Sequence, residues 1–260
     1  MTIYTWVRKH IRLSNGPFRV MEFPDSFLDQ KLLDIEHRNI SGTQYTLKHK
    51  FVSYRDIYET FFKYVPLRVA YAIKKYGLHE KKVLDVGCNF GQALIHFGEG
   101  SVGLELDLPV MLTARALGIR NMIRCDVEKE QWPVRDKSFD AVYCSNLLEH
   151  ALSPHLLLRK AHKALKRNGL LFVGVPLMPK QKASEKLIKW LSGLGYAHKY
   201  HINAFTRRTL CFTVERAGFE IIACGVFLAA LGPLNKILGP LIADISCQTM
   251  CVARKVESKK

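Results

Sequence analysis

A short glycine turn at residues 87–91 has the residue types of a ligand-binding loop, and it directly follows a predicted strand. The apolar run at 83–86, interrupted only by Asp85, is typical of a strand buried on both faces. Gly87 and Gly91 allow the backbone to turn sharply and a ligand to approach closely. Asn89 between them tolerates the left-handed conformation better than most residues do. The turn is therefore a candidate site for a nucleotide-like ligand.

The acid in front of this turn indicates what kind of ligand fits it. A pyrophosphate-binding turn needs the pattern G-x-G-x-x-G, whereas the spacing here is G-x-x-x-G. Asp85 would repel a pyrophosphate and attract a cation, so we expect a ligand with an ammonium or sulfonium group. This argues against a dinucleotide-dependent oxidoreductase. The apolar residues at 93–97 predict a helix whose N-terminus faces the ligand.

Further acids stand at the ends of the next predicted strands. Glu105 ends the strand predicted at 101–105, where a carboxylate could accept both hydroxyls of a ribose. Asp126 ends the strand predicted at 121–126, where it could accept an adenine amino group. A fourth strand at 138–144 is followed by Glu149 and His150. Parallel strands would bring these ends to one edge of a sheet.

In this order, the motifs at 83–150 resemble those of class I S-adenosylmethionine-dependent methyltransferases with a type 11/23-like domain. In that family the first motif is D-x-G-x-G-x-G, and Asn89 departs from its middle glycine. The resemblance implies S-adenosylmethionine as cofactor. It also implies a set of cofactor-binding residues: Asp85, Gly87, Asn89, Gly91, Glu105, Asp126, Val127 and Asn146.

The candidates for proton transfer follow the fourth strand. Methyl transfer from a sulfonium is a direct displacement, and a hydroxyl acceptor needs a base, most often histidine. We predict His150, Glu149 and His201 as catalytic residues, with His198 as a rival base. Some quinone-type relatives bind a divalent metal beside a similar Glu-His pair. Asn146 stands where those relatives carry another acid, so we predict no metal here.

The alternation of strands and helices over residues 82–176 predicts an α/β fold, a doubly wound, seven-stranded, mostly parallel sheet of the Rossmann-like methyltransferase type. Helices are predicted at 55–76, broken near Pro66, at 154–166 and at 207–217, and a strand at 170–176. The last two strands, 219–227 and 247–254, should form the antiparallel pair that the family has. Residues 1–54 are predicted as an N-terminal helical extension or lid. Residues 55–256 are predicted as the methyltransferase domain, with a substrate-side insert at 177–205 and an apolar insert at 228–245.

The chain is strongly basic, with 39 Lys and Arg against 23 Asp and Glu, a formal net charge of +16. Such a charge favours anionic partners, namely RNA, an anionic membrane surface or an acidic substrate, although it is also compatible with a solvated face. The apolar insert is too short and too broken by Gly-Pro pairs to span a membrane. It could cap the core, form a dimer contact or contact a membrane surface or lipid tail.

Seven cysteines without a C-x-x-C pair argue for free thiols in a reducing compartment and against zinc. With no apolar signal-peptide stretch at the N-terminus, the expected location is cytoplasmic, with peripheral membrane contact as an option. We expect methyl transfer, as O-methylation, to a small-molecule, lipid-linked or glycan acceptor. The alternative is an RNA methyltransferase, although no RNA-recognition motif is visible. A catalytically silent cofactor-binding partner subunit also stays open.

Overall fold

A computed structural model of the chain describes residues 17–19, 21–31, 36–38, 44–46, 53–176, 201–226 and 249–256. The helices are α2 (Asp25–Leu28), α3 (Tyr54–Ile57), α4 (Leu67–Tyr76), α5 (Leu108–Ala116), α6 (Pro154–Ala164) and α8 (Arg207–Arg216), with a π-helical turn η2 (Tyr58–Phe62) and 3₁₀ turns η3 (Leu78–Glu80), η4 (Leu94–His96) and η5 (Leu148–His150). The strands are β1 (Glu36–Arg38), β2 (Gln44–Thr46), β3 (Val83–Val86), β4 (Val102–Glu105), β5 (Met122–Arg124), β6 (Phe139–Ser145), β7 (Leu165–Val175), β8 (Phe219–Val226) and β9 (Thr249–Lys255).

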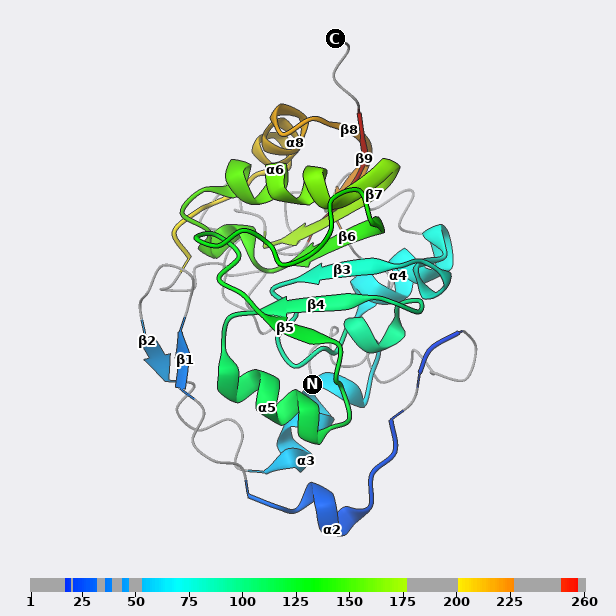
Figure 1. Cartoon of the computed structure of the whole chain (residues 1–260), viewed down its shortest axis with the longest axis vertical. Coiled ribbons are helices and arrows are strands. Elements are labelled where there is room, and N and C mark those ends of the chain that lie inside the picture. The colour runs from blue at the N-terminus through cyan, green and yellow to red at the C-terminus, as the bar shows by residue number, and fades with distance from the viewer. Residues whose placement is uncertain are drawn as a thin grey trace, which may run out of the picture.

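Seven strands form one sheet in the order β5-β4-β3-β6-β7-β9-β8, while β1 and β2 form a separate antiparallel pair. Strands β3 to β7 are parallel to their neighbours, whereas β9 is antiparallel to both β7 and β8. Figure 1 shows these strands stacked across the middle of the molecule, from β5 below to β8 at the top. The predicted fold, a mostly parallel sheet that ends in an antiparallel pair, is confirmed.

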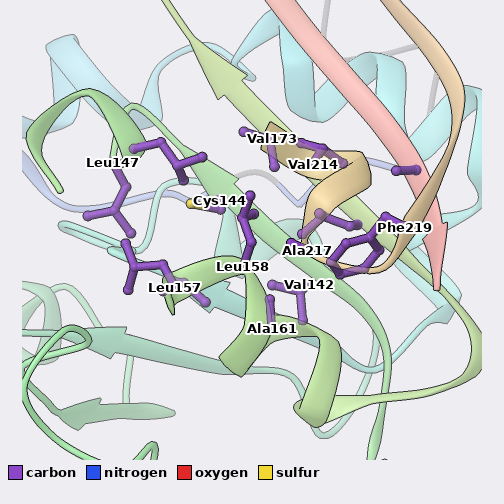
Figure 2. Packing of buried hydrophobic residues seen from close by; sticks show 14 of the residues in the cluster. Val142, Cys144, Leu147, Leu157, Leu158, Ala161, Val173, Val214, Ala217 and Phe219 are labelled. Carbon is purple, nitrogen blue, oxygen red and sulfur yellow. The ribbon is translucent and has the colours of Figure 1, made fainter. Parts of the chain in front are cut away.

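Two apolar cores cover the two faces of this sheet. Side chains at alternate positions of a strand point to opposite faces, so Leu84 packs in the core with α6 and α8 while Val83 packs in the core with α4 and α5. Figure 2 shows the first core, which gathers side chains of β6 (Val142), α6 (Leu158) and α8 (Val214). This packing on both faces fixes the carboxyl ends of the parallel strands relative to one another.

The predicted break at Pro66 is present. The helix that begins at α3 continues as a π-helical turn and stops before Pro66, and α4 begins at the next residue. Proline has no N–H to donate within a helix, but it is tolerated where a helix begins. The last predicted helix, 207–217, matches α8, which starts with a capping box between Thr206 and Thr209.

Two predicted helices are longer than the helices in the structure. The helix expected at 93–97 is only the 3₁₀ turn η4, because Gly98 packs against backbone: a Cβ there would lie 2.6 Å from the Lys81 nitrogen. The Ile95 N–H donates to the Gly91 carbonyl in one α-helical hydrogen bond, but the Gly98 N–H donates to the carbonyls of Leu78 and Lys81 instead, so the helix does not continue. Helix α6 ends at Ala164 rather than at Lys166, since Leu165 already pairs with Phe139 and starts β7.

Several predicted features lie outside the described residues. They are most of the N-terminal extension, residues 177–200 of the substrate-side insert with His198, and the whole apolar insert 228–245. The domain boundaries therefore stay predictions. Within the part of the chain that is described, no helix combines the length and apolar character needed to cross a membrane.

Candidate active site

The candidate site lies where the strand order of the sheet reverses. The chain runs outward from β3 to β4 and β5, then returns to the other side of β3 as β6. In open α/β sheets, ligands bind in the crevice at the carboxyl ends of the strands at such a point. Asp85 in β3, Glu105 at the end of β4 and Asn146 after β6 all belong to this edge.

The glycine turn after β3 has the left-handed backbone that its residue types predict. Gly87, Asn89 and Gly91 have φ values of 70°, 52° and 80°. A Cβ on Gly87 would lie 3.1 Å from Leu147, and one on Gly91 would lie 3.0 Å from Ile119. Both the left-handed backbone and the close packing of Leu147 and Ile119 therefore require glycine at residues 87 and 91.

Asp85 is a buried carboxyl group that lacks a complete set of partners. Its side chain is 3% exposed, and its Oδ2 atom has no hydrogen-bond partner among the described residues. Burial, and next the charge of Glu105, raise the pKa of Asp85 to about 8. A buried carboxylate without a counter-charge is costly, so this atom fits a cationic group supplied by a ligand.

Glu105 holds the glycine turn against the end of β4. Its Oε2 accepts the Asn89 N–H at 2.8 Å, and its Oε1 accepts the N–H groups of Leu106 and Asp107 at 2.8 and 3.0 Å. Burial raises the pKa of Glu105, while these backbone hydrogen bonds lower it. A carboxylate can accept about four hydrogen bonds, so at least one acceptor position is left for a ligand hydroxyl.

The loop after β5 is fixed by its own hydrogen bonds. Asp126 accepts the N–H groups of Glu128 and Lys129 through Oδ1, both at 3.1 Å. The carbonyl of Val127 accepts from Trp132 Nε1 and Lys160 Nζ, both at 2.9 Å. The predicted adenine contact of Asp126 would therefore have to come from Oδ2, which lies 3.6 Å from the Lys129 ammonium.

Arg68 is a site residue that the sequence reasoning missed. It is 5% exposed, and its Nη1 donates to Ser145 Oγ at 2.7 Å and to Asn146 Oδ1 at 2.8 Å. Asn146 has a φ of 57°, so the guanidinium fixes a left-handed turn at the end of β6. The sequence does contain an indication of this role. Arg68 lies between Val65 and Val69 on the apolar face of the helix, where a charged residue needs a buried partner.

Glu149, His150 and His201 come together beside this turn. The rings of His150 and His201 meet edge to face with centroids 4.8 Å apart. The N–H groups of Ile202 and Asn203 donate to the Glu149 carbonyl at 2.9 and 3.0 Å, which attaches the segment before α8 to η5. The two histidines, far apart in sequence, thus form one cluster.

Glu149 is the buried acid of this cluster. It is 2% exposed, and its Oε2 has no hydrogen-bond partner within the described part of the chain. Burial raises the pKa of Glu149 to about 7, although Arg68 opposes the shift. One carboxylate oxygen and one ring nitrogen from each histidine lie within 4.8 Å of one another. Such a group can exchange protons near neutral pH or hold a cation.

The two parts of the site are adjacent. Both Glu149 and Asp85 act on Cys144 of β6, since the charges of both raise the pKa of this thiol after burial. The strand before the glycine turn pairs with β6, and Leu147, directly before η5, lies beside Gly87, so the two parts of the site are neighbours. Fold and site together define a Rossmann-like enzyme domain suited to a cationic nucleoside and to proton transfer.

Comparison with known proteins identifies the family. A family described as "Methyltransferase domain" matches residues 54–223. The ubiquinone biosynthesis O-methyltransferase of Glaesserella parasuis is 32% identical over 120 residues, 42% of this chain and 51% of that protein. The enzyme of the same name from Pseudomonas aeruginosa is 26% identical over 150 residues, 54% of this chain and 63% of that protein. The chain thus spans between half and two thirds of the length of these relatives.

Solved structures share the fold. A methyltransferase of Bacillus halodurans superposes with a TM-score of 0.54 at 19% identity, covering 73% of this chain and 99% of that one. An Archaeoglobus fulgidus methyltransferase gives 0.51 at 20% identity, covering 78% and 99%. The chain belongs to the methyltransferase domain family, and the resemblance to class I S-adenosylmethionine-dependent methyltransferases is confirmed. The family match gives this chain a methyltransferase domain over residues 54–223.

Proposed function

We propose that this chain transfers the methyl group of S-adenosylmethionine to a hydroxyl group of a small molecule. The observation that carries the proposal is the pairing of His150 with His201 beside the buried Glu149. A hydroxyl must lose its proton as it attacks, and an imidazole with a pKa near neutrality is suited to take it. The relatives named ubiquinone biosynthesis O-methyltransferase support the same reaction class.

The cofactor side of the site is assigned as follows. The residues fit S-adenosylmethionine because the unpartnered Oδ2 of Asp85 suits its ammonium group. We assign the remaining acceptor position of Glu105 to the ribose hydroxyls. Gly87, Asn89 and Gly91 would form the floor of the pocket. Asp126, Val127 and Asn146 would line its adenine and methyl-donor ends, in the order in which they follow β5 and β6.

In this proposal the protein's own groups orient the acceptor and move its proton. S-adenosylmethionine supplies an electrophilic methyl group, so alignment of the acceptor oxygen is the main requirement. His150, on η5, takes the hydroxyl proton. His201 packs on its ring and restricts its orientation, and Glu149, with a pKa of about 7, stabilises the positive charge that His150 gains.

A divalent cation on Glu149, His150 and His201 is the competing role for the same side chains. Their three ligand atoms lie within 4.8 Å of one another. Asn146 stands where quinone-type relatives have an acid, and its Oδ1 already accepts from Arg68. We therefore propose proton transfer rather than metal binding. Methyl transfer that persists after chelation with EDTA supports this choice, whereas activity that returns only with Mg²⁺ or Mn²⁺ contradicts it.

The experiment that tests the function is methyl transfer from radiolabelled S-adenosylmethionine to a panel of acceptors. The panel contains catechols with and without an isoprenoid tail, a glycan and a transcribed RNA. Label in the catechols, with product identified as the methyl ether, supports the proposal. Label only in RNA, with a steep salt dependence of binding, would favour the RNA alternative that the net charge of +16 suggests. Cofactor binding without any transfer would indicate a silent partner subunit.

A further inference from the structure

Three cysteines from separate elements meet between α8 and the outer hairpin of the sheet, away from the site described above. Cys211 lies in α8, Cys224 in β8 and Cys251 in β9. Their three sulfur atoms lie within 4.8 Å of one another. All three are free thiols rather than members of a disulfide.

The sheet dictates two of these positions. Cys224 and Cys251 are direct partners in the antiparallel register of β8 and β9. Side chains at directly opposed positions project from the same face of a sheet. Both pack into the apolar core that also holds α8, through its buried residues Leu210 and Val214. The helix then brings Cys211 over the pair, so the cluster follows from the packing of α8 on the hairpin.

The cluster has the electrostatics of a metal-binding group. Hydrogen bonds from the thiols of Cys224 and Cys251, and the nearby charge of Arg207, lower the pKa of Cys211 to about 3. The hydrogen bond with Cys211 and burial raise the pKa of Cys224 to about 12, while hydrogen bonds with Cys211 and Cys224 raise the pKa of Cys251. A thiolate, not a thiol, is the form that binds metal ions.

Access and size also suit an ion. Cys211 and Cys224 are half-buried while Cys251 is buried. An ion could therefore reach the sulfur atoms from solvent and bind next to the apolar core. Zinc–sulfur bonds of about 2.3 Å in a tetrahedral site place sulfurs about 3.8 Å apart. The observed separations, all within 4.8 Å, need to contract only slightly.

We propose that Cys211, Cys224 and Cys251 bind one soft d¹⁰ divalent cation of the Zn²⁺ and Cd²⁺ class through their three sulfur atoms. Three metal–sulfur bonds form, the three cysteines bind as thiolates, and the protons of their S–H groups leave to solvent. The resulting group has a net charge of −1, which Arg207 compensates. The fourth position is left to water. The ion would join α8 to the edge strand β8, and α8 directly follows the segment that carries His201.

The test is titration of the reduced, metal-free, full-length protein with Cd²⁺, whose bonds to thiolates absorb in the ultraviolet. We expect one ion per chain, release of protons from the thiols in weakly buffered solution, and a higher melting temperature. Each of Cys211→Ser, Cys224→Ser and Cys251→Ser should weaken binding by at least about tenfold, since even the loss of an outer-shell partner costs that much. Cys125→Ala, which removes another buried thiol, should leave the stoichiometry and affinity unchanged.

Two further measurements keep the proposal testable if a variant folds poorly. X-ray absorption of the Zn²⁺-loaded wild-type protein should show three sulfurs at about 2.3 Å. Fewer than three sulfurs, or an absorption titration that is unchanged in Cys211→Ser, overturns the proposal. So does a wild-type protein that binds no Cd²⁺ at one equivalent, which would leave the cysteines as packing residues only. None of these outcomes depends on the methyl acceptor.

Discussion

The ring of His150 packs edge to face on the ring of His201, with 4.8 Å between their centroids. His150 ends the turn after β6, and His201 precedes α8, so only the fold brings the two rings together. Asn203 maintains the contact, because its side-chain amide donates to the carbonyls of Leu148 and Ala151 in the turn. This histidine pair is the part of the site that we propose for proton transfer.

Replacing His150 by alanine should reduce kcat by about 100-fold or more, since a positioned base contributes this much. The Kd for S-adenosylmethionine should change little, because His150 lies on the acceptor side. His155→Ala is the matched control, since His155 is an exposed histidine at the start of α6. A full kcat in His150→Ala with wild-type pH dependence would assign the base elsewhere.

Replacing Asp85 by asparagine should weaken S-adenosylmethionine binding by at least about tenfold, because a charge-assisted hydrogen bond to the ammonium is lost. Calorimetry on the purified variant measures this effect. Asp136→Asn serves as control, because Asp136 is an exposed acid whose partner is Lys163. Wild-type affinity in Asp85→Asn would contradict the assignment of the cationic end of the cofactor.

The same substitution should change the pH dependence of stability. The pKa of Asp85 is raised from 3.8 to about 8 in the folded protein, so the folded state binds this proton more tightly than the unfolded state. Protonated Asp85 therefore contributes to the free energy of unfolding. This contribution is complete below about pH 4 and is lost as the pH rises toward 8. Asp85→Asn removes this loss. We expect its free energy of unfolding at pH 8 to exceed that of the wild type by at least about 1.4 kcal/mol, the value of a single pKa unit.

Urea denaturation at pH 4 and pH 8 without cofactor measures this difference. The gain of Asp85→Asn over the wild type should be larger at the higher pH. A variant that is less stable than the wild type at pH 8 would show that the carboxylate of Asp85 has a partner in the folded protein. The expected combination, weaker binding with higher stability, is the signature of a functional residue held at an energetic cost.

Replacing Arg68 by alanine should destabilise the fold by roughly 2–4 kcal/mol, because Ser145 and Asn146 lose hydrogen bonds from a buried charge. The turn at Asn146 should loosen, so activity should fall as well. Denaturant unfolding and a kinetic assay measure the two effects. Arg115→Ala, on the exposed face of α5, should stay within about 0.5 kcal/mol of the wild type. An equally small effect in Arg68→Ala would show that Arg68 does not fix the turn.

Replacing Asn203 by alanine should free the segment that carries His201, so kcat should fall while the Kd for S-adenosylmethionine stays near that of the wild type. Asn121→Ala is the matched control, since the Asn121 amide also donates to a backbone carbonyl, that of Ser101, at the opposite end of the strands. Both variants should lose about 1–3 kcal/mol of stability. If kcat falls equally in both, Asn203 is a structural residue and does not position His201.

Much of this site could be predicted from the sequence, because its cofactor half is local. Asp85, Gly87 and Gly91 lie in one strand and the turn that follows it, and the left-handed φ of Asn89 is a property of its own residue type. The order of acids after β4 and β5 also follows from the alternation of apolar runs. What local pattern could not show was the true length of the element after the turn, since Gly98 is limited by the backbone of Lys81.

Other features depend on side chains that meet only after folding. Arg68 was identified as a site residue only from its hydrogen bonds, which connect α4 to the end of β6. The cysteines argued against zinc because no two of them have a zinc-binding spacing. The register of β8 and β9, with α8 packed on them, nevertheless gathers three of them.

The sequence by itself determined the fold family, the cofactor and the turn that would hold it, because these follow from periodicity and from residue types at short separation. The tertiary structure decided which histidines meet, which arginine holds the turn at Asn146 and which thiols lie together. These are contacts between elements that are distant in the chain. Their distances are set by the packing of helices on a sheet, which no local pattern of residues records.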